Sequence, residues 1–194
     1  MSNFFVVEGD NGVGKTSVLQ IISGIQDVVL CKTPQIEYTP IRVSVDNSEN
    51  NHARFLYYLS STFFAESTIR KFPKEPRVIC DRYITSCFVD YAIREKLDFE
   101  VIYPIYTFFN NMILQPTKSF LLTCDHEQRI HRVSGRTNNS INDNLTKEYS
   151  NQTNALYQGF ITTDPDSWHV INTTHRKLDD IADEMWQVIS NVHC

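Results

Sequence analysis

Short runs of apolar residues alternate with longer stretches of helical periodicity along most of this chain. The apolar runs Asn3–Glu8, Asp27–Lys32, Arg77–Asp81, Lys118–Cys124 and Trp168–Ile171 predict five buried strands. Helical periodicity predicts helices over Lys15–Ser23, Asn50–Phe72, Ser86–Glu95, Glu100–Asn111, His126–Ser134, Asp143–Phe160 and Lys177–Ser190. Strands separated by helices indicate an α/β fold with a five-stranded, parallel, doubly wound sheet. Ligands of such sheets bind at the carboxyl ends of the strands.

The chain has 194 residues, which suits one domain with a sizeable core, and no repeat or linker divides it, so we predict a single domain over residues 1–194. Its net charge of −5 argues against a nucleic acid polymer as partner, but a small phosphorylated ligand needs only a few local cations. No apolar segment predicts a membrane span, and the N-terminus becomes acidic too early for a signal peptide. Five cysteines without CxxC spacing predict reduced thiols in a cytoplasmic protein rather than disulfides or a zinc site.

A complete GxxxxGK[ST] motif lies between the first predicted strand and the first predicted helix. It comprises Gly9, Asp10, Asn11, Gly12, Val13, Gly14, Lys15 and Thr16, and Ser17 follows it. Such glycines let successive backbone N–H groups point at phosphate oxygens, and the following helix adds partial positive charge. We expect Lys15 to hold the β- and γ-phosphates of ATP and Thr16 to bind Mg²⁺. A chance glycine-rich turn is the alternative, which the flanking strand and helix disfavour.

Two charged residues close the third predicted strand. Asp81 ends it, so its carboxylate is expected at the ligand edge of the sheet, where it can hold Mg²⁺ directly or through water. Arg82 follows at the same edge, and its planar fork suits the phosphate of an acceptor molecule. A surface ion pair at a strand end is the alternative for both residues.

Three arginines share one face of the predicted helix over His126–Ser134 and its continuation. Arg129, Arg132 and Arg136 are spaced by three and four residues and run into the polar stretch Gly135–Asn144, which predicts a loop or flap. Arginines on such a flap can close over a triphosphate and neutralise the charge that develops during transfer. We predict that Arg129 binds ATP and that Arg132 and Arg136 act in catalysis. A solvated basic helix face is the alternative.

These motifs together resemble the thymidylate kinase family of P-loop nucleoside and nucleotide kinases. The resemblance rests on the strand Phe5–Gly9 that enters the P-loop, on Asp81-Arg82-Tyr83 with Ser86 three residues later, on the arginine-bearing helix, and on the final strand and helix. It implies a P-loop NTPase fold with a LID segment at about residues 129–146. It also implies Mg²⁺-dependent transfer of the γ-phosphoryl group of ATP to a deoxynucleoside monophosphate, with dTMP as the default acceptor.

The resemblance also implies an acceptor site and a homodimer. The acceptor site comprises Asn11, Lys32, Tyr58, Thr62, Arg82, Ser86, Cys87, Asp90 and Tyr91. Within it, Lys32 lies where the family has an arginine, and Tyr58 lies where an aromatic residue stacks on the base. The predicted helices over Asn50–Phe72 and Ser86–Glu95 are candidates for the dimer interface, with ordinary core packing as the alternative.

Several of these positions depart from the family's pattern. Asn11 replaces the acid that faces the sugar, and Thr62 replaces an arginine that donates to a thymine carbonyl. Cys87, Asp90 and Tyr91 replace the usual polar or aromatic set, and a carboxylate such as Asp90 would accept from an exocyclic amine. Because a wrong polar partner discriminates by roughly 10⁴-fold or more, two alternatives stay open. One is a kinase for a nucleoside or for an amine-bearing or modified nucleotide such as a cytidine monophosphate, and the other is a catalytically inactive nucleotide-binding protein.

Overall fold

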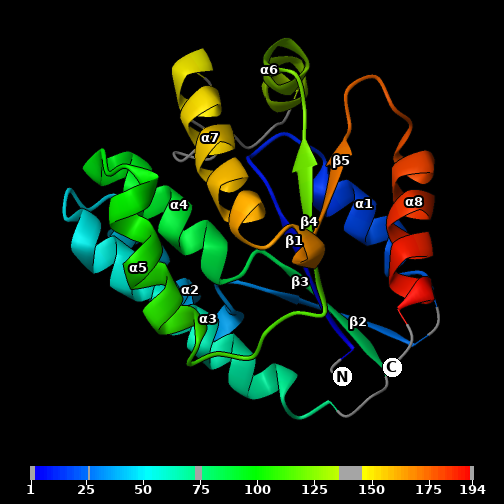
Figure 1. The fold of residues 1–194 in the computed structure, drawn as a ribbon, viewed down its shortest axis with the longest axis horizontal. Helices are drawn as coiled ribbons and strands as arrows, with labels where there is room; N and C mark the ends of the chain where they lie inside the picture. Colours follow the sequence, from blue (N-terminus) through cyan, green and yellow to red (C-terminus); the bar gives the residue numbers. More distant parts are fainter. Residues whose placement is uncertain (1–2, 26, 73–75, 136–145, 193–194) are drawn as a thin grey trace.

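The computed structural model describes residues 3–25, 27–72, 76–135 and 146–192. Its strands are β1 (Phe4–Glu8), β2 (Val28–Lys32), β3 (Arg77–Asp81), β4 (Lys118–Thr123) and β5 (Trp168–Asn172). They pair in parallel in the order β2-β3-β1-β4-β5, which confirms the predicted five-stranded α/β sheet (Figure 1). Strand β1 is the central strand, so the loop that follows it lies in the middle of the edge formed by the carboxyl ends of the strands. Ligands of such sheets bind at this edge.

Helices cover both faces of the sheet (Figure 1). They are α1 (Lys15–Ile22), α2 (Thr39–Asp46), α3 (Asn51–Ile69), α4 (Ile84–Glu95), α5 (Phe99–Asn110), α6 (His126–Ser134), α7 (Lys147–Thr163) and α8 (Leu178–Asn191), with the 3₁₀ turns η1 (Ile36–Tyr38) and η2 (Pro165–Ser167). The helices α1 and α8 pack on one face, and α3, α4, α5 and α7 pack on the other. Helix α7 begins at Lys147, where the Thr146 side chain caps the Tyr149 N–H, rather than at the predicted Asp143, which lies outside the described residues.

The central strand β1 has core on both sides, and its five residues are all buried. Phe4 and Val6 pack toward α3, α4 and α7, whereas Phe5 and Val7 pack toward α1 and α8. This is the period of two that a strand imposes, and a parallel sheet covered on both faces needs apolar residues in both sets. Burying each such side chain contributes roughly 1.5–3 kcal/mol, so the strand beneath the P-loop is a rigid base.

The sequence patterns did not predict helix α2. Its eight residues include Pro40 near the start, and none of them is buried, so no hydrophobic stripe marks it. Contacts with α3 hold it instead, because Asp46 forms an ion pair with Arg54 and accepts a hydrogen bond from Tyr58, both on α3. Helix α2 thereby becomes one wall of the site described below.

Membrane-spanning helices, clustered metal ligands and disulfides are absent from the described part of the chain. No helix there is both long and apolar enough to cross a bilayer. No group of three or more His, Cys, Asp or Glu side chains is arranged there to hold a metal by itself. The described cysteines Cys31, Cys80, Cys87 and Cys124 are free thiols.

Candidate functional site

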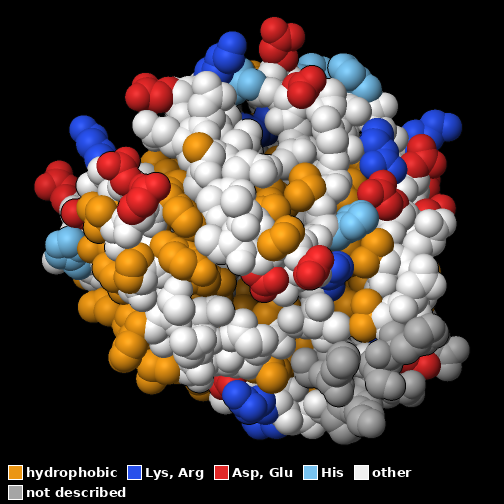
Figure 2. Space-filling view, in the orientation of Figure 1, with side chains coloured by type: hydrophobic (Ala, Val, Ile, Leu, Met, Phe, Trp, Pro, Cys, Tyr) orange, Lys and Arg blue, Asp and Glu red, His pale blue; other side chains and the backbone are white. Residues whose placement is uncertain are grey.

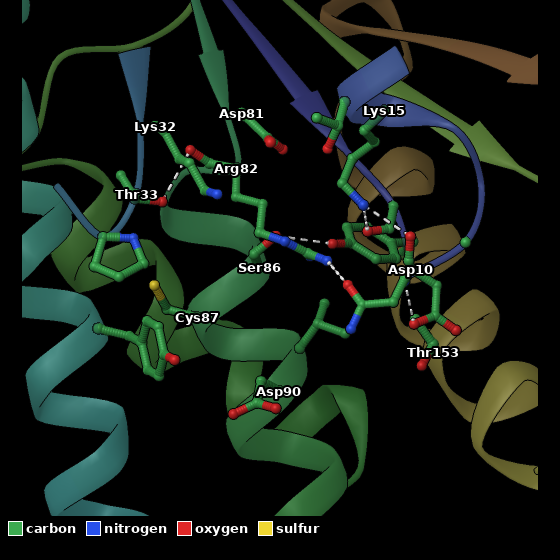
Figure 3. A pocket seen from close by; sticks show the side chains of 18 of the residues that line it. Asp10, Lys15, Lys32, Thr33, Asp81, Arg82, Ser86, Cys87, Asp90 and Thr153 are labelled. Carbon is green, nitrogen blue, oxygen red and sulfur yellow. Dashed lines mark hydrogen bonds between the residues drawn. The ribbon is translucent and has the colours of Figure 1, made fainter. Parts of the chain in front are cut away.

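The loop between β1 and α1 forms a cradle around one ammonium group (Figure 3). Gly9, Gly12 and Gly14 adopt φ angles of 129°, 88° and 101°, which other residues rarely tolerate. The Nζ of Lys15 donates to the carbonyl oxygens of Gly9 at 2.8 Å and Asp10 at 2.7 Å. The first turn of α1 has no acidic residue and no side-chain cap, so its positive dipole end is not neutralised by a local carboxylate, which suits an anion. The loop therefore has the geometry of a phosphate-binding P-loop.

Helix α6 packs directly beneath this loop. A Cβ atom at Gly12 would lie 2.8 Å from both Arg129 Cγ and Val133 Cγ2, so the two segments meet at van der Waals distance only because this residue is glycine. Arg129 is buried and forms an ion pair with the Asp10 carboxylate. The P-loop and the start of the predicted LID are thus packed as one unit.

Arg132 fastens α6 both to the P-loop and to the segment after β5. Its Nη1 donates to the Val13 carbonyl oxygen at 3.3 Å, and its Nη2 donates to the Thr173 carbonyl oxygen at 2.8 Å. Arg136, the third arginine of the predicted set, lies outside the described residues. The contacts of all three arginines with ATP stay predictions.

Lys32 and Asp81 are the last residues of the neighbouring strands β2 and β3, and they are paired in the sheet register. Asp81 points from β3 toward the P-loop (Figure 3). Its Oδ1 is buried and has no hydrogen-bond partner among the described residues. A buried carboxylate oxygen left without a donor fits a group that completes its bonding through a metal ion or metal-bound water. Asp81 and the Thr16 hydroxyl, which line the same cavity, therefore suit Mg²⁺.

Arg82 bridges the P-loop and α4. Its backbone takes a φ of 69°, and its N–H donates to the Val7 carbonyl oxygen at 3.0 Å. Its Nη2 donates to Asn11 Oδ1 at 2.7 Å and its Nη1 to Ser86 Oγ at 3.3 Å (Figure 3). Three residues of the predicted acceptor site, Asn11, Arg82 and Ser86, are therefore in direct contact.

A buried carboxylate, which no sequence motif marks, supports Arg82. Glu8 is fully buried and accepts hydrogen bonds from Tyr83 N at 3.0 Å, from Tyr157 Oη at 3.1 Å and from Ser86 Oγ. Burial raises the pKa of Glu8 above its usual 4.5, although these hydrogen bonds and the charge of Arg82 lower it. The only signal in the sequence is an acidic residue at the end of an apolar strand.

The raised pKa of Glu8 predicts a pH-dependent stability. The folded protein binds the Glu8 proton more tightly than the unfolded chain does. The stabilisation that this adds to the free energy of unfolding is therefore complete below pH 4.5 and is lost as pH rises through the raised pKa. Glu8→Gln should remove this loss, by about 1.4 kcal/mol for each unit by which the pKa is raised. Urea unfolding at pH 5 and pH 8 should show a smaller decrease in the free energy of unfolding for the variant than for the unmodified protein.

Glu184→Gln is the matched control for this experiment. Partial burial raises the pKa of Glu184, but the hydrogen bonds from Arg176 and His169 outweigh it and hold that pKa below 4.5. Glu184 therefore stays ionised from pH 5 to pH 8, so its variant should not show the loss of carboxyl titration that is expected for Glu8→Gln. An unchanged slope in Glu8→Gln would contradict the assignment.

A single cavity joins the P-loop to the ends of β2 and β3 and to α2, α3, α4 and α7. Its lining includes the predicted residues Gly9, Asp10, Asn11, Gly12, Gly14, Lys15, Thr16, Ser17, Lys32, Tyr58, Asp81, Arg82, Ser86, Cys87 and Asp90. It also includes residues that were not predicted, namely Thr33, Pro34, Arg42, Arg54, Phe55, Val89, Tyr149, Thr153 and Tyr157. Most of the missed residues come from α2, α3 and α7, which approach the P-loop only in the folded chain.

Five described residues of the predicted site lie outside this lining: Arg129 and Arg132, whose contacts are given above, and Val13, Thr62 and Tyr91. Val13 packs into the core shared by α1 and α8. Thr62 is fully buried behind the cavity wall, where its Oγ1 donates to the Tyr58 carbonyl oxygen at 2.9 Å and lies 3.4 Å from Cys87 Sγ. Tyr91 follows Asp90 and is therefore rotated about 100° around α4, so it stacks on Phe55 and its Oη lies 3.0 Å from His52 Nδ1. We therefore withdraw the prediction that Thr62 and Tyr91 contact the acceptor directly.

Comparison with known proteins points in one direction. The family model described as thymidylate kinase matches residues 7–185. The thymidylate kinase of Staphylococcus haemolyticus is 26% identical over 204 residues and that of Staphylococcus epidermidis is 27% identical over 201; the alignments cover 98% and 97% of this chain and 98% of each relative.

Solved structures agree on the fold. The thymidylate kinase of Candida albicans superposes with a TM-score of 0.75 at 16% identity, covering 97% of this chain and 91% of that one. The thymidylate kinase of Ehrlichia chaffeensis superposes with a TM-score of 0.63 at 18% identity, covering 96% and 97%.

Proposed function

The chain belongs to the thymidylate kinase family, and from that premise we propose that it transfers the γ-phosphoryl group of ATP to a deoxynucleoside monophosphate, with dTMP as the default acceptor. One observation carries the proposal: the Lys15 cradle, the Asp81 carboxylate and the Arg82 fork line the same cavity at the same edge of the sheet. The donor and acceptor phosphates of a kinase must meet in such an arrangement.

Each part of the cavity has a chemical task in this reaction. Lys15 and the backbone N–H groups of the P-loop bind the ATP phosphates and compensate their charge. Arg82 and Lys32 hold the acceptor phosphate from the opposite side, and Asn11 and Ser86 orient the guanidinium of Arg82. Mg²⁺, held by Thr16 and Asp81, would neutralise phosphate charge when bound. The protein therefore acts by alignment and electrostatics rather than by a covalent intermediate.

The open alternatives differ in what they require of the acceptor end. Both oxygens of Asp90 already accept hydrogen bonds from Arg94 Nε at 3.1 Å, and Oδ2 also accepts from Arg54 Nε at 3.1 Å. A carboxylate paired with two guanidinium groups is a weak candidate for binding an exocyclic amine, which argues against the cytidine-type acceptor. A catalytically inactive nucleotide-binding protein would have no need for an acceptor-side fork such as Arg82.

A coupled assay of ADP release tests the proposed function. Purified protein with ATP and Mg²⁺ is supplied in turn with dTMP, dUMP, dCMP, dGMP, thymidine and deoxycytidine. The panel is broad because the Candida albicans enzyme is noted for broad substrate specificity. We expect turnover with dTMP; turnover only with nucleosides or dCMP would support the first alternative, and ATP binding without any transfer would support the second.

We also propose that the protein is a homodimer. Val101, Ile105, Phe108 and Met112 form an exposed stripe along α5 and just beyond it, at the spacing of one helix face. Figure 2 shows hydrophobic side chains gathered over this side of the molecule. Exposed apolar stripes of this kind are typical of protein interfaces. Helix α4, a candidate from the sequence, carries no exposed large hydrophobic residue and packs as core, so α5 replaces it as the proposed interface.

Light scattering coupled to size exclusion measures the molecular mass directly and checks this assembly; a mass of one chain would contradict it.

The free thiols are consistent with a reducing compartment, and we propose a cytoplasmic location.

A further inference from the structure

A buried cation lies in the helical wall of the cavity. Arg54, in the first turns of α3, lines the cavity, and its side chain is only 5% exposed. Lys32 and Arg82, which we propose hold the acceptor phosphate, already supply two cations at the sheet edge. A third cation buried in the helical wall needs a different explanation, because burying a charge without partners is unfavourable.

The surroundings of Arg54 hold its guanidinium in one orientation. Its Nε donates to Asp90 Oδ2 at 3.1 Å, its Nη1 donates to Asp46, and its Cζ lies 4.8 Å from the centre of the Tyr58 ring. Tyr58 Oη donates to Asp46 at 2.7 Å, and burial and that hydrogen bond raise the pKa of Tyr58 to about 12, so the hydroxyl keeps its proton. Carboxylates on two sides and an aromatic ring on a third position the group rigidly.

The remaining nitrogen of this guanidinium is left for a ligand. No described residue accepts a hydrogen bond from Arg54 Nη2. Burial raises the pKa of Asp46, but hydrogen bonds from Tyr58 and Arg54 outweigh it, so the carboxyl stays ionised and engaged. The cluster holds three guanidinium groups, Arg42, Arg54 and Arg94, against the two carboxylates, which leaves one net positive charge. This part of the cavity therefore offers a hydrogen-bond donor and little free acceptor capacity.

We infer that Arg54 is a specificity-determining residue that donates a hydrogen bond to a carbonyl on the acceptor's base and so selects pyrimidines with a 4-keto group. The inference rests on the proposed function and names the base class that the same site takes. With the acceptor phosphate at Arg82 and Lys32, the base extends toward α3. Position 4 of a pyrimidine lies across the ring from N1, which carries the sugar, and so it is the edge that reaches Arg54. Thymine and uracil present an oxygen there, whereas cytosine presents an amine, which would meet a donor.

The test is the ratio of kcat/KM for dTMP to kcat/KM for dCMP. We expect the unmodified protein to prefer dTMP by about 10³-fold or more, since a site built around one hydrogen bond rejects the analogue that cannot form it. Arg54→Gln should reduce this ratio by about 100-fold, mainly through kcat/KM for dTMP, because the amide can also accept from an amine. Turnover of dUMP should decrease with that of dTMP, since both carry the 4-keto group.

Arg94→Gln is the matched control. Arg94 pairs with the same Asp90 but does not line the cavity, so its loss should change the ratio by about threefold or less. If Arg54 only joins α2, α3 and α4, then Arg54→Gln will slow all acceptors equally and leave the ratio unchanged, which overturns the inference.

Two further outcomes are separable. Should Arg54→Gln fail to fold, Arg54→Lys keeps a charge between the carboxylates and should lower the ratio by about tenfold; an unaltered ratio in that variant also overturns the inference. Failure of the unmodified protein to phosphorylate any monophosphate refutes the proposed function itself. Turnover with a preference for dCMP leaves the kinase assignment standing and refutes the role of Arg54 alone.

Discussion

Lys15→Ala should lower kcat by about 10³-fold or more, since the variant loses the one ammonium group held inside the P-loop. That group neutralises charge on the phosphates as the γ-phosphoryl group is transferred, and water cannot replace it in the same position. The fold should remain, because α1 and β1 are held by apolar packing on both faces of the sheet. Steady-state kinetics with saturating dTMP measures the loss, and circular dichroism verifies the fold.

Lys118→Ala is the control for this substitution. Lys118 starts β4 at the opposite end of the sheet, where its Nζ donates to the Asp166 carbonyl oxygen. Its loss should leave kcat within about twofold of the original value, as expected for a surface residue away from the site. Near-normal turnover in Lys15→Ala would defeat the P-loop assignment on which the proposed function depends.

Replacement of Arg82 by Gln should lower kcat/KM for dTMP by about 10²- to 10³-fold, because a charged fork aimed at the acceptor phosphate is lost. The affinity for ATP should change by about threefold or less, since the cradle for its phosphates stays intact. Calorimetry with ATP and kinetics with varied dTMP separate the two effects. Equal losses for ATP and dTMP would contradict an acceptor-side role.

Two variants sharpen the test of Arg82. Arg82→Lys keeps the charge but not the planar fork, so it should recover part of the lost activity. Arg70→Gln removes an exposed arginine that pairs with Glu66 at the end of α3, and it should leave both constants unchanged. If Arg82→Lys shows no recovery while it remains folded, the bidentate geometry rather than the charge carries the interaction.

The local patterns of the chain were sufficient for the sheet and for the phosphate-binding loop. Strand β3 and helix α6 have the bounds that apolar runs and periodicity predicted, because burial on both faces demands apolar strands and one buried stripe demands a helical period. The P-loop was predictable because its function depends on backbone conformation, and glycines at fixed spacing encode that conformation.

The wall of the proposed acceptor site could not be predicted from such local patterns. Helix α2 has no hydrophobic stripe, so no periodicity marks it, and its place depends on ion pairs with α3. Arg54 is an ordinary charge in a helical stretch until the fold brings Asp90 to it from 36 residues away. Thr62 stands at a position that resemblance assigned to base contact, yet packing places it behind Cys87.

The chain's own order of residues thus determined the class of fold and the glycine-rich loop at which we propose that a triphosphate binds, since both depend on short-range periodicity and backbone geometry. The acceptor end took shape through long-range contacts, such as the hydrogen bond that joins Glu8 to Tyr157 across 149 positions. Ion pairs and buried hydrogen bonds between distant helices leave no periodic mark in a sequence. They form because the folded core excludes water and leaves those groups no other partners.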